Sequence, residues 1–399
     1  MADPPPIAKL SDRSTPAEVE TFATAELANF FATQLNPYAA QRDEACEVIP
    51  RAAFEHSADI GLLNYLLPRE VGGIGGGRRT FGLLLEQVGY LCEDPGYVSM
   101  LAMYADVPNV IYRTRRPQLL ERYVYPMASG AKLGTFAYTD YGDAFDFQTR
   151  VVREGDDYVV NGVKCLQTGG ALADVFVTYA RDEKDDMRVL LIDRGDRGVT
   201  TRPVKTLGQR SAGLTQLTLD HVVLGKERDL GDADGLAEAQ SFLNSRRLFL
   251  VCPLVGMMKH ILETCVRHLD TVVREGRPLT QAPTVQGRLG NMYAKHLTSQ
   301  AILHDALGRV GRGEINDLFD PVVSAAKLVI TENAVDVAEQ AVRLTGWRGY
   351  ASEELPFQRM YRGAMAALTG QTAQDVLEIN LGVVATSEVI LQDQARSLV

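Results

Sequence analysis

The chain of 399 residues is 46% hydrophobic, 23% charged and 7% aromatic. These proportions are those of a globular protein and exclude a disordered, collagen-like or coiled-coil chain. Its 41 Lys and Arg residues against 51 Asp and Glu residues give a net charge of −10, which argues against a nucleic-acid or anionic-membrane partner. The length allows two or three domains of about 150 residues each.

The spacing of cysteine and histidine residues argues against disulfide bonds and metal sites. The five cysteines are scattered and lack C-x-x-C spacing, so we expect neither a disulfide framework nor a zinc site. Pairs of histidines and acids in the last third lack a third ligand at metal spacing, so no metal site is expected. No apolar signal core follows the N-terminus, and the longest apolar stretch, Leu248–Met258, is too short to span a bilayer. We therefore expect a cytoplasmic protein without a membrane partner.

The first third of the chain has a helical pattern. Residues 15–18 (TPAE) form a capping box with proline at the first helical position. Apolar residues at helical spacing predict further helices over 38–57, 79–96, 98–113 and 116–125. The glycine-rich stretch 71–77 lacks the Lys-Ser/Thr of a P-loop and follows no β-rich run, so we interpret it as a flexible connection between helices.

The hydrophobic period changes in the middle third. Turn residues such as Glu154-Gly155-Asp156 separate short β-rich runs, which is typical of an antiparallel sheet or small barrel. From about residue 232 the helical pattern returns, with long helices predicted over 234–274, 284–311 and 318–345. The order helical, β, helical predicts an α+β fold, divided into a helical domain, a β domain and a helical bundle over residues 1–131, 132–228 and 229–399.

Six stretches in this order resemble segments of the acyl-CoA dehydrogenase superfamily, and together they cover nearly the whole chain. They are residues 67–73 (LPREVGG), 125–130 (YPMASG), 134–140 (GTFAYTD), 158–164 (YVVNGVK), 285–292 (VQGRLGNM) and 356–362 (PFQRMYR). The resemblance implies an N-terminal helical domain, a central antiparallel β domain and a C-terminal four-helix bundle, in a homodimer or homotetramer. In that family a glutamate removes the α-proton of an acyl thioester while FAD takes the β-hydride.

The family's catalytic glutamate has no counterpart at either of its two familiar places. Its Glu-Gly-Thr near the C-terminus corresponds to residues 368–372 (LTGQT), which puts Gly370 or Thr369 at the glutamate position. The alternative acid, which precedes an arginine on the first helix after the β domain, corresponds to Arg246, followed by Arg247. Because a guanidinium stays protonated, Arg246 cannot act as the base.

The resemblance also implies FAD, but some of the expected contacts are replaced. Thr139 and Thr168 match the threonines that hydrogen-bond the isoalloxazine ring. Leu166 stands where the family has a tryptophan beside the flavin, which removes an aromatic wall. Phe145 stands in place of a serine hydroxyl that would face phosphate.

The contacts expected at the far end of the cofactor are mixed. Arg274 matches an arginine that the family directs at the cofactor of a neighbouring subunit, but Glu275 beside it would bring negative charge near a pyrophosphate. Gly346 retains one of two glycines that approach the adenine side, and Trp347 replaces the second. These replacements weigh against conventional tight binding of FAD.

The polar and aromatic residues nearest the expected reaction centre are the candidates for catalysis. Tyr138 and Asp140 form a cluster with Asp143 and Asp146 where the family's substrate and cofactor meet. With these two we select Tyr104 and Arg246 as candidate catalytic residues.

The joint loss of the base and of flavin contacts favours an enzyme repurposed away from α,β-dehydrogenation. We expect a cyclisation, rearrangement or elimination of a small apolar or thioester-derived metabolite, free or bound to CoA or a carrier protein, driven by positioning and hydrogen bonding. One alternative is an FAD-dependent oxidoreductase, either a dehydrogenase with a relocated base or a flavin monooxygenase. A second alternative is a catalytically inactive partner subunit.

Overall fold

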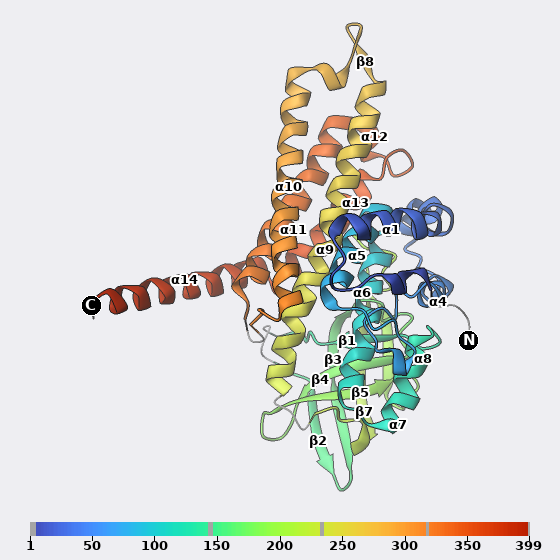
Figure 1. The fold of residues 1–399 in the computed structure, drawn as a ribbon. Helices are drawn as coiled ribbons and strands as arrows, with labels where there is room; N and C mark the ends of the chain where they lie inside the picture. The colour runs from blue at the N-terminus through green and yellow to red at the C-terminus, as the bar shows by residue number, and fades with distance from the viewer. Residues whose placement is uncertain (1–4, 143–146, 232–234, 317–318, 398–399) are drawn as a thin grey trace. The chain divides into compact units, whose positions relative to one another are not determined.

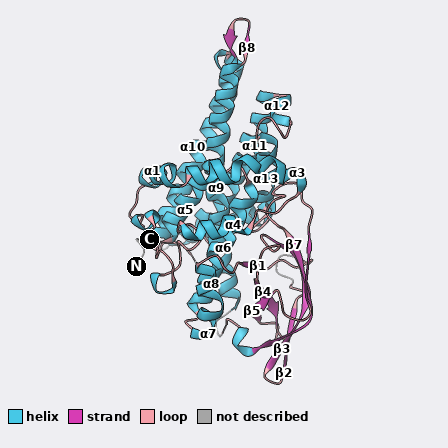
Figure 2. Ribbon diagram, turned by 90° about the vertical axis from the view of Figure 1, so that its right-hand side faces the viewer, coloured by secondary structure: helices cyan, strands magenta, loops and turns pink. Residues whose placement is uncertain are grey.

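The computed structural model describes residues 5–142, 147–231, 235–316 and 319–397 (Figure 1). These residues form two compact units, Met1–Ala239 and Gln240–Val399. The first unit contains helices and the sheet, and the second is almost wholly helical (Figure 2). This order of helical, β and helical segments confirms the α+β class. The finer division at residues 131 and 228 stays a prediction.

Short helices open the first unit. They are α1 (Pro16–Glu26), α2 (Ala28–Phe30), α3 (Ala39–Ala45), α4 (Arg51–Asp59), α5 (Arg78–Leu91), α6 (Pro95–Arg113), α7 (Pro117–Leu119) and α8 (Tyr125–Ala128). The capping box is confirmed, since the side chains of Thr15 and Glu18 each accept a hydrogen bond from the other's backbone N–H. The single helix predicted over 38–57 is wrong. Cys46 adopts a left-handed conformation with φ of 52° and ends α3, and Pro50 precedes α4.

The glycine-rich stretch 71–77 connects helical segments, as expected, but it is held in place rather than flexible. The backbone N–H of Gly75 donates to the carbonyl of Leu67 at 2.7 Å, and that of Gly76 donates to the carbonyl of Tyr65 at 2.9 Å. A Cβ atom on Gly76 would lie 2.1 Å from the ring of Tyr65. Glycine therefore allows this stretch to lie directly against an aromatic ring.

One seven-stranded sheet forms the rest of the first unit. Its strands are β1 (Gly134–Ala137), β2 (Arg150–Glu154), β3 (Asp157–Gln167), β4 (Val175–Arg181), β5 (Met187–Asp193), β6 (Val199–Pro203) and β7 (Thr215–Gly225). Their order is β1-β4-β2-β3-β7-β6, with β5 paired to β4. Most pairs are antiparallel, as predicted, but β1 runs parallel to β4 and β2 meets β4 in parallel at one position.

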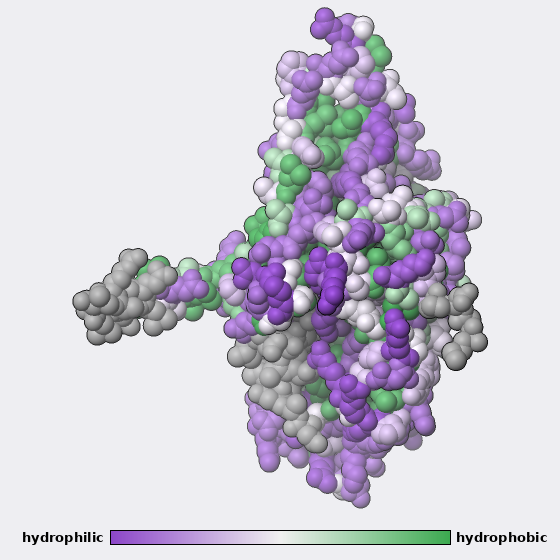
Figure 3. Space-filling view, viewed as in Figure 1, coloured by the Kyte–Doolittle hydropathy of each residue, from purple (hydrophilic) through white to green (hydrophobic). Residues whose placement is uncertain are grey.

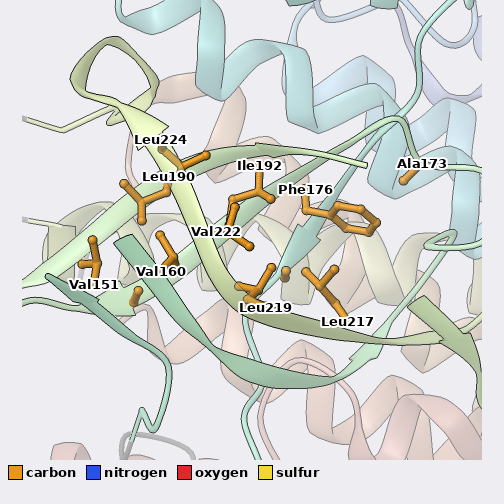
Figure 4. Packing of buried hydrophobic residues seen from close by; sticks show 12 residues of the cluster. Val151, Val160, Ala173, Phe176, Leu190, Ile192, Leu217, Leu219, Val222 and Leu224 are labelled. Carbon is orange, nitrogen blue, oxygen red and sulfur yellow. The ribbon is translucent and has the colours of Figure 1, made fainter. Parts of the chain in front are cut away.

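Apolar side chains from strands and neighbouring loops fill one core of the sheet (Figure 4). Phe176 of β4 is fully buried among Ile192 of β5 and Leu217 of β7. Val152 of β2 instead points away and is 39% exposed, while the preceding Val151 is buried. This alternation is that of a strand with one face packed on a core.

Long helices form the second unit, although the first of them begins in the first unit. They are α9 (Gly235–Thr271), α10 (Pro283–Arg312), α11 (Pro321–Thr345), α12 (Trp347–Tyr350), α13 (Phe357–Thr369) and α14 (Gln374–Ser397). The hairpin of β8 (Val273–Arg274) and β9 (Arg277–Pro278) joins α9 to α10. Within this unit α11 packs against α10 and α13, and most of α14 projects from the other helices (Figure 1).

The part of α9 from Arg246 to Thr271 is long and apolar enough to cross a membrane by length and composition. In the structure, however, 61% of its most apolar window is buried. This burial is that of a core helix rather than of a membrane span.

Truncation of the buried Phe176 tests the assignment of the core. Phe176→Ala should lower the free energy of unfolding by about 3–5 kcal/mol, because it removes apolar contacts and leaves a cavity. Val152→Ala on the exposed face of the same sheet is the matched control and should change stability by less than about 0.5 kcal/mol. Urea unfolding followed by circular dichroism measures both, and equal midpoints for the two variants would contradict the core assignment.

Candidate functional site

A buried ion pair fixes the segment that carries the first candidate residues. The ammonium Nζ of Lys164 on β3 lies 2.6 Å from Oδ1 of Asp140, and the two side chains are 0% and 2% exposed. The other carboxylate oxygen of Asp140 accepts a hydrogen bond from the backbone N–H of Thr149, and the Thr149 hydroxyl donates to Oδ1. Lys164 also donates to the carbonyl of Tyr138 at 2.9 Å. Both ends of the segment 138–149 are thus tied to β3.

These contacts give Asp140 a role different from the expected one. Its carboxylate is enclosed and accepts from an ammonium, an amide and a hydroxyl, so it has little access to a substrate proton. Burial lowers the pKa of Lys164 to about 8, although the charge of Asp140 acts in the opposite direction. The geometry favours Asp140 as an anchor of the segment.

Tyr138 belongs to an aromatic cluster beside this pair. Its ring meets Phe147 and Tyr179 edge-on, with ring centroids 5.0 Å apart in both cases. Lys164 lies 4.8 Å from the centroid of the Phe147 ring. The candidate Tyr138 is therefore brought together with Asp140, and both pack around Lys164. Asp143, Phe145 and Asp146 lie outside the described residues.

Tyr104, the third candidate in this unit, supports a neighbouring turn. It is 2% exposed, and its hydroxyl donates to the carbonyl of Gly169 at 2.6 Å. Burial raises the pKa of its phenol well above the ordinary value. The hydroxyl of Thr135 donates to the carbonyl of Thr168 in the same turn. Tyr104 and Thr135 thus position the backbone of residues 168–169.

The two candidate flavin-binding threonines lie on adjacent segments. The carbonyl of Thr139 accepts a hydrogen bond of 2.9 Å from the backbone N–H of Cys165, three residues before Thr168. Thr139 is exposed, Thr168 is half-buried, and Leu166 between these segments is 44% exposed. Neither threonine hydroxyl is hydrogen-bonded to another part of the chain that the structure describes. Two available hydroxyls flanking an apolar side chain are a fitting edge for a planar heterocycle such as the isoalloxazine of FAD.

In the second unit, basic side chains hold the turn between α13 and α14. Lys327 on α11 is fully buried and donates to the carbonyls of Leu368 and Thr372 and to Oε1 of Gln374, at 3.3, 3.0 and 2.6 Å. Arg247 donates to the Thr372 hydroxyl at 3.0 Å. Burial and the charge of Arg247 lower the pKa of Lys327 to about 8.

The same turn has a strained backbone. Gln371 and Thr372 have φ of 54° and 90°, and neither is glycine. Such conformations cost about 1–3 kcal/mol each and persist where surrounding contacts impose them. Lys327 and Arg247 supply those contacts at the stretch expected to match the family's Glu-Gly-Thr.

The remaining candidates of the second unit lie in different places within it. Arg246 is 3% exposed on α9, directly before Arg247. Gly346 caps α11 with φ of 61°, and the Trp347 side chain beyond it is 64% exposed. Arg274 is exposed on the hairpin of β8 and β9. Two acids lie near the α13–α14 turn: Glu332 on α11 accepts a hydrogen bond of 3.3 Å from Nε2 of Gln374, and Asp375 is exposed on α14.

Two lysines that organise these sites were missed by sequence reasoning. Lys164 and Lys327 stand among apolar residues, where alternation or helical period places a side chain inside. A charged residue at an inward position is the signal that points to a buried partner. Metal chemistry has no candidate here, because no group of three or more potential ligands exists among the described residues.

Comparison with known proteins identifies the family. Residues 18–131, 135–222 and 233–380 match the N-terminal, middle and C-terminal domains of acyl-CoA dehydrogenase, respectively. The chain therefore belongs to the acyl-CoA dehydrogenase superfamily, which confirms the resemblance found in the sequence.

Individual relatives span nearly the whole chain. Cyclohex-1-ene-1-carbonyl-CoA dehydrogenase of Geobacter metallireducens is 30% identical over 83% of this chain and 88% of its own length. The crystal structure of the prolyl acyl carrier protein oxidase AnaB matches with a TM-score of 0.86 at 20% identity, over 94% of this chain and 99% of its own. Glutaryl-CoA dehydrogenase of Mycobacterium smegmatis in complex with FADH2 matches with 0.85 at 24% identity, over 92% and 94%.

Removal of Lys164 tests the anchor of the segment 138–149. Lys164→Met should lower the free energy of unfolding by about 3–5 kcal/mol, because it leaves the buried Asp140 carboxylate uncompensated. The double variant Lys164→Met/Asp140→Asn should recover much of that loss. Arg150→Met, which breaks the exposed pair with Asp185, is the control and should cost at most about 1 kcal/mol.

Chemical denaturation followed by circular dichroism gives the three values. If Lys164→Met is no more destabilising than Arg150→Met, the buried pair does not anchor the segment.

Proposed function

We propose that this protein is an FAD-dependent oxidoreductase acting on an acyl thioester, carried on CoA or on a carrier protein. Two threonines on adjacent segments, Thr139 after β1 and Thr168 after β3, carry the proposal: the first is exposed and the second is half-buried. Family membership and a relative named as an acyl-CoA dehydrogenase at 30% identity support it. The complex of glutaryl-CoA dehydrogenase with FADH2 is a case of this cofactor on this fold.

The non-redox transformation that the sequence favours has less support than its alternative. The relatives described above are named as dehydrogenases or an oxidase, and none is named for a cyclisation or rearrangement. The replaced flavin contacts are at other positions than Thr139 and Thr168, and the hydroxyls of these two threonines are available. We therefore place the oxidoreductase first. Candidate catalytic roles for Tyr138 and Arg246 and a cytoplasmic location remain part of the proposal.

The chain's own residues bind and orient in this function. When bound, FAD supplies a hydride acceptor or donor. Thr139 and Thr168 would hold its ring edge by hydrogen bonds, and Tyr104 and Thr135 keep the Thr168 backbone in place. In the second unit, Lys327 and Arg247 hold the turn at Gln371 and Thr372, and neither of these two residues is a carboxylate. A dehydrogenation would thus need a base from elsewhere, whereas a flavin monooxygenase needs no α-proton base.

The visible spectrum of the purified protein tests this function. We expect flavin absorption bands with one FAD per chain, either as purified or after reconstitution with FAD. Thr139→Ala and Thr168→Ala should each raise the Kd for FAD about 2- to 10-fold, as expected for the loss of one hydrogen bond. Thr200→Ala, at an exposed threonine of β6, is the matched control and should leave the Kd unchanged.

A colourless protein that does not bind FAD or reduced flavin on titration would reject the oxidoreductase and return the non-redox alternative to first place. Equal Kd values for the threonine variants and the control would show that FAD binds away from Thr139 and Thr168.

We also propose that the chain assembles as a homo-oligomer through α14. Ile379, Val383 and Ile390 recur at spacings of four and seven residues and are 65%, 60% and 51% exposed. Apolar residues lie along the part of this helix nearer the other helices (Figure 3). An apolar stripe on a projecting helix is a contact surface, and a second copy in a symmetric pair would cover both stripes.

Charge on this stripe should dissociate the assembly. Ile379→Glu/Val383→Glu should yield a monomer, because each carboxylate would be buried without a partner in the contact. Ala385→Glu, on the opposite side of the same exposed stretch, should keep the wild-type assembly. Sedimentation velocity distinguishes the species, and a wild-type protein that is monomeric at micromolar concentration would contradict the proposal.

A further inference from the structure

An exposed aromatic side chain lies two residues beyond Thr139. Tyr141 is 67% exposed, yet its hydroxyl accepts a hydrogen bond from Nε2 of Gln216. The Oε1 atom of that same amide accepts from Nε of Arg202. Gln216 itself is only 8% exposed. A largely buried amide, oriented by an arginine, thus fixes the outer end of a ring that solvent would otherwise leave mobile.

The strand register places Gln216, which holds this ring, opposite the stretch of β3 that contains Leu166. Gln216 stands on β7 between Thr215, which pairs with Gln167 on β3, and Leu217, which pairs with Lys164. The register shift between Lys164 and Gln167 leaves Cys165 and Leu166 opposite Gln216. On its other side, Cys165 bonds the carbonyl of Thr139 through its backbone N–H. Contacts on both sides of β3 therefore hold Thr139 and Tyr141 near the stretch of that strand that carries Leu166.

The side chains of Tyr141, Thr139 and Thr168 are suited to binding a planar ligand. Large aromatic side chains prefer burial, and one that is exposed and held by a hydrogen bond at its tip is a ready-made stacking surface. The threonines nearby supply hydrogen bonds to the edge of a heterocycle, but Leu166 supplies no aromatic surface. A tyrosine ring with a fixed hydroxyl has little conformational freedom to lose on binding.

We propose that Tyr141 supplies the aromatic wall against the isoalloxazine ring of FAD at the place where Leu166 provides none. Gln216 and Arg202 are positioning residues, which act on the flavin only through Tyr141. This inference rests on the proposed function, because it requires that the chain bind FAD. With Tyr141 as the aromatic surface, Thr139 and Thr168 would bind the edge of the isoalloxazine ring, and Tyr141 would stack on its face.

The experiment measures flavin fluorescence and affinity rather than turnover. Tyrosine stacked on isoalloxazine quenches its emission, so Tyr141→Leu should raise the emission of bound FAD severalfold and raise its Kd about 10-fold. Tyr141→Phe keeps the stacking ring but loses both the tether to Gln216 and the phenol that donates an electron to the excited flavin. It should therefore lose most of the quenching while its Kd rises only about 2- to 3-fold. Gln216→Leu should show the same small rise in Kd but keep most of the quenching, since it releases the tip of the ring and leaves the phenol in place.

The control is Tyr125→Leu, at another exposed tyrosine of the first unit, which is 45% exposed on α8 and should leave emission and Kd unchanged. Circular dichroism melting checks that the Tyr141 variants stay folded, as expected for a side chain at the surface.

The outcomes separate the two proposals. If the wild type binds FAD but Tyr141→Leu keeps its emission and Kd, the aromatic wall is refuted and the oxidoreductase stands. If Tyr141→Phe raises the Kd as much as Tyr141→Leu, the hydroxyl and not the ring is responsible, which also refutes the wall. If the wild type binds no FAD, both proposals fall.

Discussion

The ion pair between Lys164 and Asp140 is the constraint on which the candidate cofactor edge depends. The segment 138–149 is joined to the sheet by β1 before it and β2 after it, and it carries Thr139 and Tyr141 between them. A purely apolar contact would bury this segment without fixing its register on β3. A short charged contact with additional hydrogen bonds from Thr149 and to Tyr138 favours one register over its neighbours. These hydrogen bonds also offset part of the cost of burying the two charges.

Periodicity predicted which parts of the chain are helical and which are strands, because each side chain's burial there depends on its near neighbours. Periodicity did not predict features that depend on backbone conformation or on residues far away in the sequence. The split of the helix predicted over 38–57 depends on the left-handed Cys46, and the parallel pairing of β1 with β4 depends on how the chain enters the sheet. The glycines at 75 and 76 are expected to form a flexible link, but the carbonyls of Leu67 and Tyr65, eight and eleven residues earlier, hold them.

The sequence indicated which residues to consider at the site, but not what each of them does there. The sequence placed Thr139 and Thr168 among the candidate flavin-binding residues, and the structure leaves their hydroxyls available. It placed Asp140 and Tyr104 among catalytic candidates because acids and phenols can transfer protons, whereas their buried contacts with Lys164 and Gly169 favour support. The partner of Asp140 lies 24 residues away, a separation that no local pattern reveals.

The proposed function separates two tasks that the family combines. Holding the flavin edge falls to Thr139, Thr168 and the residues around them in the first unit. Proton removal in the family falls to a carboxylate whose expected counterparts here, Gly370 and Arg246, belong to the second unit. A chain can therefore keep the first task while the second is lost or moves to another group, because different units of the fold carry them.

The exposed position of Trp347 has a practical consequence for studying these units. It is the only tryptophan of the chain, and it lies at the surface of the second unit. Its emission therefore reports on its surroundings in the second unit. A flavin held by the first unit, as proposed, would absorb and emit at longer wavelengths. The holoprotein would then carry two optical signals of separate origin, by which the loss of structure in each unit can be timed independently.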